Sequence, residues 1–158
     1  MKIIKNFLPK EDFEKIKVTM TNPFFPWYLN DGVNLEKDGY IQFTHIFFNN
    51  TSYVNSPHFN LIEPILKKLQ IKALLRVKAN LLHRTEKIIE HGYHTDFNYE
   101  NTTSIFYINT NNGYTKFKNK KICKSEENKL VYFNSKIEHT GSTCTDENYR
   151  VVLNINYF

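Results

Sequence analysis

Apolar residues recur with a helical period near the start of the chain. Within the segment Pro9–Met20, the residues Phe13, Ile16 and Met20 are spaced three and four positions apart, which places them on one face of an α-helix. The proline suits a first helical turn, and the acidic residues lie early while most of the lysines lie late, as the helix dipole favours. The pattern therefore predicts a short amphipathic helix over Pro9–Met20.

A second helix is predicted after Ser56 and Pro57, which offer an N-cap and a first helical position. Its apolar positions are Leu61, Ile62, Ile65, Leu66 and Leu69. Pro64 lies inside this run and cannot donate a helical hydrogen bond, so we expect it to shift the start of the helix or to kink it. Between the two helices, residues 40–48 alternate as a strand does, and we interpret His45 there as a hydrogen-bonded structural residue.

From Ala73 onward the apolar residues recur at every second position, as they do in strands. The predicted strands are residues 75–82, Lys87–Ile89, Ser104–Asn109, Tyr114–Phe117, Lys129–Phe133 and Tyr149–Phe158. Two helices followed by many short strands predict a single, mainly β (α+β) domain over residues 1–158. Its helical and extended part covers residues 1–72, and a jelly-roll core covers residues 73–158.

Composition agrees with a globular, β-rich protein, because aromatic residues make up 15% of the 158 positions. The two cysteines, Cys123 and Cys144, form no Cys-x-x-Cys pair, and we interpret them as reduced thiols of a cytoplasmic protein. No apolar run has the length that a signal peptide or a membrane span requires. We therefore expect a cytoplasmic protein without a membrane partner.

The chain is basic, with a net charge of +5 and a lysine cluster over Lys116–Lys121. A positive surface attracts nucleic acid or another acidic partner. The alternative interpretation is a lysine-rich surface that keeps the protein in solution, and we favour it because one loop of lysines does not form a groove.

Candidate chemistry centres on His94, Asp96 and His139. The first two are two positions apart, so on a strand both side chains would lie on the same face. Two imidazoles and one carboxylate form the facial triad typical of non-haem Fe(II), with open positions for substrate and dioxygen. His91 is a rival ligand at a helical spacing from His94, but Gly92 argues against a helix, so we expect His91 near the site or on the surface.

Arg150 follows His139 by eleven positions, which leaves room for a short connection and a return strand. A guanidinium group keeps its charge in a protein interior and can hold a carboxylate through two parallel hydrogen bonds. Arg150 is therefore the candidate anchor for a carboxylate ligand.

Several motifs occur in the order found in 2-oxoglutarate- and Fe(II)-dependent oxygenases of the prolyl 4-hydroxylase-like branch. They are His94-Thr95-Asp96, Ile105-Phe106-Tyr107-Ile108-Asn109, Asn112-Gly113-Tyr114-Thr115-Lys116-Phe117, Leu130-Val131-Tyr132-Phe133 before His139, and Arg150. The chain resembles this family from about residue 80 to its end, and Phe7-Leu8-Pro9 resembles the usual entry to such domains. In its short length the chain resembles the small oxygenases of phages and bacteria.

The resemblance implies a double-stranded β-helix that binds Fe(II) and 2-oxoglutarate. The implied site residues are His94, Asp96 and His139 as iron ligands, Arg150 and Tyr107 at the distal carboxylate of 2-oxoglutarate, and Asn80 as a weaker candidate at its chelating end. Asn80 is weaker because it shares a strand face with Arg76 and Lys78, which suggests a face directed to solvent.

The activity implied by the resemblance is hydroxylation of an unactivated carbon, with a peptidyl proline as the family-based expectation. Dioxygen and 2-oxoglutarate would be consumed, succinate and carbon dioxide released, and ascorbate would serve as a supporting reductant. Two alternatives stay open: oxidation of a nucleobase or nucleoside, suggested by the basic charge, and a non-catalytic jelly-roll binding module. We expect the substrate to be selected by the first third of the chain and by loops such as Thr21–Asp38.

Overall fold

The computed structural model describes residues 1–34 and 38–158, so part of the loop Thr21–Asp38 lies outside the described residues. The elements in chain order are β1 (Lys2–Ile4), α1 (Lys10–Met20), β2 (Tyr28–Asn30), β3 (Gln42–Asn49), β4 (Val54–Asn55), the 3₁₀ helix η1 (Phe59–Ile62), α2 (Glu63–Leu69), β5 (Leu74–His83), β6 (Thr102–Tyr107), β7 (Tyr114–Phe117), β8 (Ile122–Lys124), β9 (Lys129–Asn134), β10 (His139–Gly141) and β11 (Tyr149–Tyr157).

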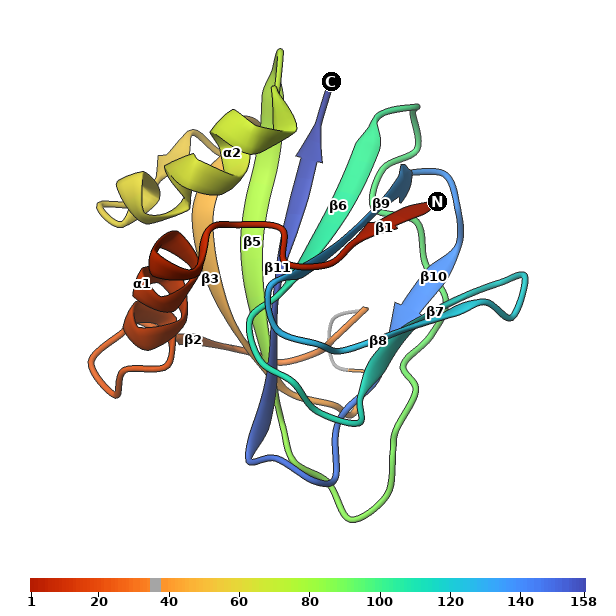
Figure 1. Ribbon diagram of the computed structural model, residues 1–158. Coiled ribbons are helices and arrows are strands. Elements are labelled where there is room, and N and C mark those ends of the chain that lie inside the picture. Colours follow the sequence, from red (N-terminus) through yellow and green to blue (C-terminus); the bar gives the residue numbers. More distant parts are fainter. Residues whose placement is uncertain (35–37) are drawn as a thin grey trace.

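Two antiparallel sheets form a jelly roll (Figure 1). The larger sheet has the strand order β1-β9-β6-β11-β5-β3-β2, with β4 paired to β3, and the smaller has the order β10-β7-β8. The predicted mainly β jelly roll with N-terminal helices is therefore confirmed. The larger sheet contains strands from both the 1–72 part and the 73–158 part of the chain, since β3 pairs with β5 over six residues.

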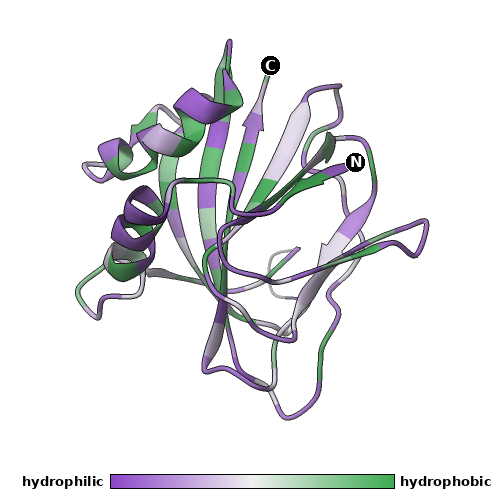
Figure 2. Cartoon of the chain, in the orientation of Figure 1, coloured by the Kyte–Doolittle hydropathy of each residue, from purple (hydrophilic) through white to green (hydrophobic). Residues whose placement is uncertain are grey.

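The helices pack on the outer face of the larger sheet, away from β10, β7 and β8 (Figure 1). The predicted apolar face of α1 is buried, since Phe13, Ile16 and Met20 are at most 3% exposed and belong to the main hydrophobic core. Figure 2 shows green and purple residues alternating along the central strands, so that one face supplies this core and the other faces the smaller sheet. No helix of the described residues has the length and hydrophobicity to cross a membrane.

The second helix begins later than the sequence predicts. Ser56 accepts a hydrogen bond from the backbone N–H of His58, so the chain first turns and then forms η1 before α2. Pro64 lies in the first turn of α2, where the missing N–H has no helical partner in any case. The prediction that Pro64 shifts the helix start is confirmed.

The predicted strand Lys87–Ile89 is wrong. Ile89 donates its backbone N–H to the hydroxyl of Thr143, and Thr143 returns its own N–H to the carbonyl of Ile89. A side chain thus takes one of the hydrogen bonds that a strand neighbour would need.

Candidate metal centre and anion pocket

His94 and His139 face each other across an isolated antiparallel bridge. Each backbone N–H donates to the other residue's carbonyl at 3.0 Å. His139 begins β10, whereas His94 lies in the connection between β5 and β6 and not in a regular strand. The bridge holds the two rings with their centroids 4.7 Å apart.

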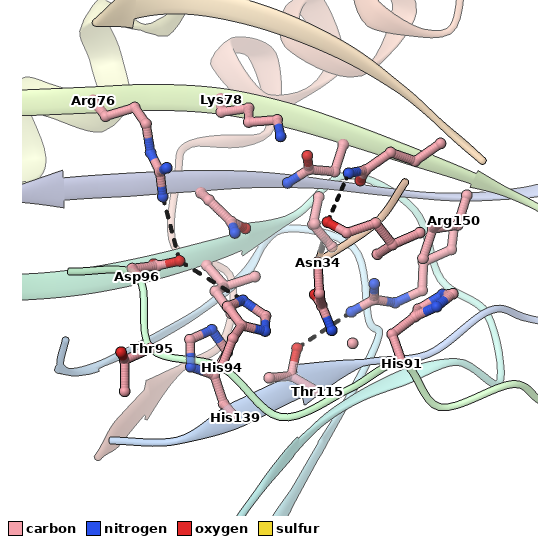
Figure 3. Close-up of a pocket in the computed structure, with 18 residues that line it drawn as sticks. Asn34, Arg76, Lys78, His91, His94, Thr95, Asp96, Thr115, His139 and Arg150 are labelled. Carbon is pink, nitrogen blue, oxygen red and sulfur yellow. Dashed lines mark hydrogen bonds and ion pairs between the residues drawn. The ribbon is translucent and has the colours of Figure 1, made fainter. Parts of the chain in front are cut away.

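The nitrogen and oxygen ligand atoms of His94, Asp96 and His139 all lie within 4.8 Å of one another. In both histidines Nδ1 faces a backbone carbonyl, that of Gly92 at 3.4 Å from His94 and that of Ile137 at 3.1 Å from His139. A proton on Nδ1 leaves Nε2 as the ligand atom. The sequence-predicted triad therefore meets in space, as Figure 3 shows.

Asp96 is held from behind by two strands of the larger sheet. Its Oδ2 accepts hydrogen bonds from Asn156 at 2.9 Å and Thr103 at 3.1 Å, while Oδ1 lies 3.3 Å from Arg76 and 3.9 Å from His94 Nε2. Burial raises the pKa of this carboxyl, but the charges of protonated His139 and of Arg76 and the Asn156 hydrogen bond outweigh burial, so the pKa lies below its ordinary value. The carboxylate is ionised at neutral pH and presents one oxygen to the histidines.

The arrangement fits a divalent transition metal. His139 Nε2 is buried and has no hydrogen-bond partner in the described part of the chain, an unsatisfied atom that a metal ion would satisfy. Burial lowers the pKa of His139, which keeps the imidazole neutral as a ligand must be. His91 is not part of the three-residue group, and His45 is a structural residue as predicted, bonded to Pro26 O and Ser56 Oγ at 2.8 Å each.

Arg150 lies at the end of the cavity opposite Asp96 (Figure 3). Its side chain is buried, and it donates from Nε to Ser125 at 2.8 Å and from Nη2 to Thr115 at 3.2 Å. It forms no ion pair with any carboxylate of the described residues, and burial lowers its pKa. A buried cation whose protein partners are all neutral is costly, so an anionic ligand would stabilise it.

Gly113 packs directly against the Arg150 side chain, where a larger residue would not fit. A Cβ at this position would lie 2.7 Å from Arg150 Cδ and 2.7 Å from the carbonyl oxygen of Thr143. The Asn112–Gly113 turn noted in the sequence is therefore needed for close packing around the guanidinium.

The fold of this chain matches that of known oxygenases. A prolyl hydroxylase from Trichoplax adhaerens, solved with a hypoxia-inducible factor peptide, aligns at a TM-score of 0.74 and 13% identity over 99% of this chain and 82% of its own. A viral collagen prolyl hydroxylase from Paramecium bursaria Chlorella virus-1, solved with 2-oxoglutarate, aligns at a TM-score of 0.65 and 12% identity over 98% of this chain and 93% of its own.

A Pseudomonas putida prolyl-4-hydroxylase aligns at a TM-score of 0.63 and 13% identity over 99% of this chain and 91% of its own. This chain has the prolyl hydroxylase fold. No family model matches the sequence, and a search of curated proteins finds no match. The likeness therefore lies in three-dimensional structure.

Within the prolyl hydroxylase fold, a cavity of about 290 Å³ joins the triad to Arg150. Asn80, which the sequence suggests is directed to solvent, lines this cavity. Tyr107 does not line it: its hydroxyl donates to Thr115 at 2.9 Å, and its ring lies 5.8 Å from the Arg150 guanidinium. Tyr107 thus lies behind the arginine, and a contact with a cosubstrate stays a prediction.

Sequence reasoning missed the cationic and amide residues of the cavity wall. Arg76 and Asn156 lie directly opposite each other on β5 and β11, and Lys78 and Asn154 form the next such pair. Asn156 accepts a hydrogen bond from Arg76 and donates to Asp96, which links this row to the triad. The signal was present in the sequence, because polar residues alternate along both strands.

Proposed function

We propose that this protein is an Fe(II)- and 2-oxoglutarate-dependent oxygenase that hydroxylates an unactivated carbon. The observation that carries the proposal is the meeting of His94, Asp96 and His139 in a cavity whose other end holds the buried Arg150, which has no ion pair among the described residues. When bound, Fe(II) and 2-oxoglutarate would supply dioxygen activation, with release of succinate and carbon dioxide.

The chain's own residues have distinct parts in this proposal. His94, Asp96 and His139 would hold Fe(II) on one side and leave positions open toward the cavity. Arg150 would bind the distal carboxylate. Its Nη1 lies near Gly141, and Gly141 is two residues after His139 on β10. Two residues span roughly 7 Å along a strand, so the guanidinium lies about that far from the metal end. A five-carbon dicarboxylate is of suitable length to reach from the metal to this guanidinium.

Similar solved structures support the proposal. One of the proteins with this fold was solved with 2-oxoglutarate and another with a peptide. A peptidyl proline is therefore the first substrate to assay. Nucleobase oxidation receives less support, because Lys116 is paired with Glu90 at 2.9 Å and Lys118 with Glu138 at 3.2 Å, which reduces the positive charge of the Lys116–Lys121 cluster.

The decisive test has two measurements. Anaerobic titration with Fe(II) should saturate at one iron per chain, and His94→Ala should remove this binding. Aerobic incubation with Fe(II), 2-oxoglutarate and ascorbate should release succinate, at a low rate without substrate and faster with it. A protein that binds no iron, or binds it equally well as His94→Ala, would instead be a non-catalytic jelly-roll module.

A further inference from the structure

Lys78 is a lysine inside the cavity that has no hydrogen bond and no ion pair among the described residues, and Asp96 acts on it only from beyond ion-pair distance. It projects from β5 into the cavity beside Arg76 (Figure 3). It forms no hydrogen bond and no ion pair with any described residue, whereas Arg76 is paired with Asp96 at 3.3 Å. A charge directed into a protein cavity loses hydration, and an anion is the partner that compensates for this loss.

The charges of the proposed complex leave Lys78 uncompensated. Asp96 neutralises Arg76, and Arg150 would take the distal carboxylate of 2-oxoglutarate. The other carboxylate would bind the metal. Lys78 then has no carboxylate of its own among the described residues, since Asp96 is paired with Arg76 and acts on Lys78 only from a distance. The substrate is the ligand left to supply this negative charge.

An open amide lies opposite this lysine. Asn154 on β11 is the direct cross-strand partner of Lys78, and its side-chain oxygen is buried without a hydrogen-bond partner among the described residues. The next pair along the same strands, Arg76 and Asn156, bonds to Asp96. A cationic donor and a free acceptor therefore lie about two residues, or roughly 7 Å along the strands, from the row that supports the metal site.

The cavity wall is not built for an apolar substrate. Its apolar residues are Val33, Leu82, Ile105 and Val152, and no Phe, Tyr or Trp is among the described residues that line it. Pockets for apolar ligands are lined mostly by aliphatic and aromatic side chains. Here amides and cations surround the metal end, which favours a polar, negatively charged ligand.

We propose that the substrate carries a carboxylate that binds Lys78, with an N–H group near it that donates to Asn154. An amino acid has both groups, and so does an acidic residue of a peptide. This proposal rests on the oxygenase function proposed above and names the substrate class of that site.

The test compares matched acids and amides in two arms. The first arm contains the free L-amino acids and their α-carboxamides, including L-proline and L-prolinamide. The second contains N-acetylated, C-amidated peptides with Asp or Glu and the same peptides with Asn or Gln. Succinate release above the background without substrate is measured for the wild-type protein, Lys78→Met, Lys78→Arg and the control Lys124→Met, which alters an exposed lysine on β8.

In one arm the acids should stimulate succinate release and the matched amides should not. Lys78→Met should lower kcat/KM for the active acid by about 10- to 100-fold, the effect of losing a hydrogen-bonded charge, with KM for 2-oxoglutarate unchanged. Lys78→Arg should retain most of the activity, and Lys124→Met should behave as wild type. Binding is measured separately under conditions that allow no reaction, with anaerobic protein loaded with Mn(II) and 2-oxoglutarate. The acid that stimulates succinate release should raise the melting temperature of this protein, and Lys78→Met should abolish the shift.

Three results would overturn the proposal: equal stimulation by acids and amides, no stimulation by any acid while background succinate release is intact, or a Lys78→Met variant that weakens 2-oxoglutarate binding instead. The last would assign the lysine to the cosubstrate. Failure of the oxygenase function itself looks different, because the wild-type protein would then show neither background succinate release nor a melting shift with 2-oxoglutarate.

Discussion

Replacing Arg150 by methionine should stabilise the ligand-free protein and remove its response to 2-oxoglutarate. Arg150 is 3% exposed, and the structure gives its guanidinium hydroxyl partners but no carboxylate among the described residues. Replacing a buried ion by an apolar residue of similar size is often stabilising by about 1–4 kcal/mol. Methionine is a flexible apolar side chain of suitable length for the vacated space.

The gain is reduced by the hydrogen bonds that the substitution removes. Ser125 loses its charged donor, which costs about 1 kcal/mol, whereas Thr115 keeps the hydrogen bond from Tyr107. The free energy of unfolding should therefore rise by about 0–3 kcal/mol. At about 2–4 °C per kcal/mol for a chain of this size, the melting temperature should stay constant or rise by up to about 12 °C.

Ligand binding should change in the opposite direction. Two hydrogen bonds between a guanidinium and a carboxylate contribute about 3–6 kcal/mol together, so the Kd for 2-oxoglutarate should rise by at least about 100-fold. For the wild-type protein, 2-oxoglutarate at about 100 times its Kd should add about 2.7 kcal/mol of stability, and Arg150→Met should show no such increase.

The assay is thermal unfolding of Mn(II)-loaded protein under argon, with and without 2-oxoglutarate. Arg84→Met is the matched control, because this arginine is exposed and outside the cavity, and it should keep the wild-type response. If ligand-free Arg150→Met melts well below the wild type, the arginine stabilises the fold and our account of a buried, uncompensated cation is refuted. If 2-oxoglutarate still stabilises the variant fully, the anion is bound elsewhere.

Three other substitutions test the remaining parts of the structure. Gly113→Ala should destabilise the protein by about 1–3 kcal/mol in urea unfolding, because its Cβ would clash with the backbone carbonyl 2.7 Å away. Asn156→Leu should weaken Fe(II) binding by about 10- to 100-fold in anaerobic titration, since it removes a hydrogen bond to Asp96, the proposed ligand. Burial lowers the pKa of His45 below 6.5, so the stability it contributes is complete above pH 6.5 and declines as the pH falls. His45→Gln should reduce this pH slope of the unfolding free energy by up to about 1.4 kcal/mol per pH unit.

Each of these has a control and an outcome that contradicts it. Gly141→Ala places a Cβ at an ordinary 3.6 Å from its neighbour and should leave stability nearly unchanged, so equal losses for both glycines would contradict the packing argument. Asn156→Asp keeps the shape but not the amide donor and should bind Fe(II) as weakly as the leucine variant; wild-type affinity for either variant would show that the hydrogen bond is dispensable. An unaltered pH slope in His45→Gln would show that other groups cause it.

The candidate metal triad could be predicted from sequence because its chemistry depends on residue type as well as on spacing. The His-x-Asp spacing occurs once in the chain, so it selects His94 and Asp96 among six histidines and 16 acidic residues, and the family resemblance adds His139. The prediction assumed a strand at His94, yet the residue lies in a single bridge to His139. This bridge between distant residues brings His94 to His139, as a paired strand would. Local sequence patterns do not specify which distant residues pair in this way.

The orientation of β5 was harder to predict. Strict alternation divides a strand into two faces, but it does not say which face is inside when both faces are covered. Arg76, Lys78 and Asn80 suggested a solvent face, because charged residues are rarely buried. In the structure this polar face lines the cavity between the two sheets, and the apolar face, with Val77 and Ala79, packs toward the helices.

This inversion follows from what the inner space of the jelly roll must hold. One part of it is filled by a small apolar cluster that includes Phe117, Val131 and Phe133. The part along β5 and β11 contains amides and cations. Apolar side chains packed over this part would leave those polar groups without hydrogen-bond partners. Because unpaired buried charges are costly, we expect a polar interior of this kind to lower the stability of the empty protein and to be compensated when ligands of opposite charge bind. We therefore expect a ligand to bind along the polar rows of β5 and β11, and the cations in these rows lead us to expect that the ligand is an anion.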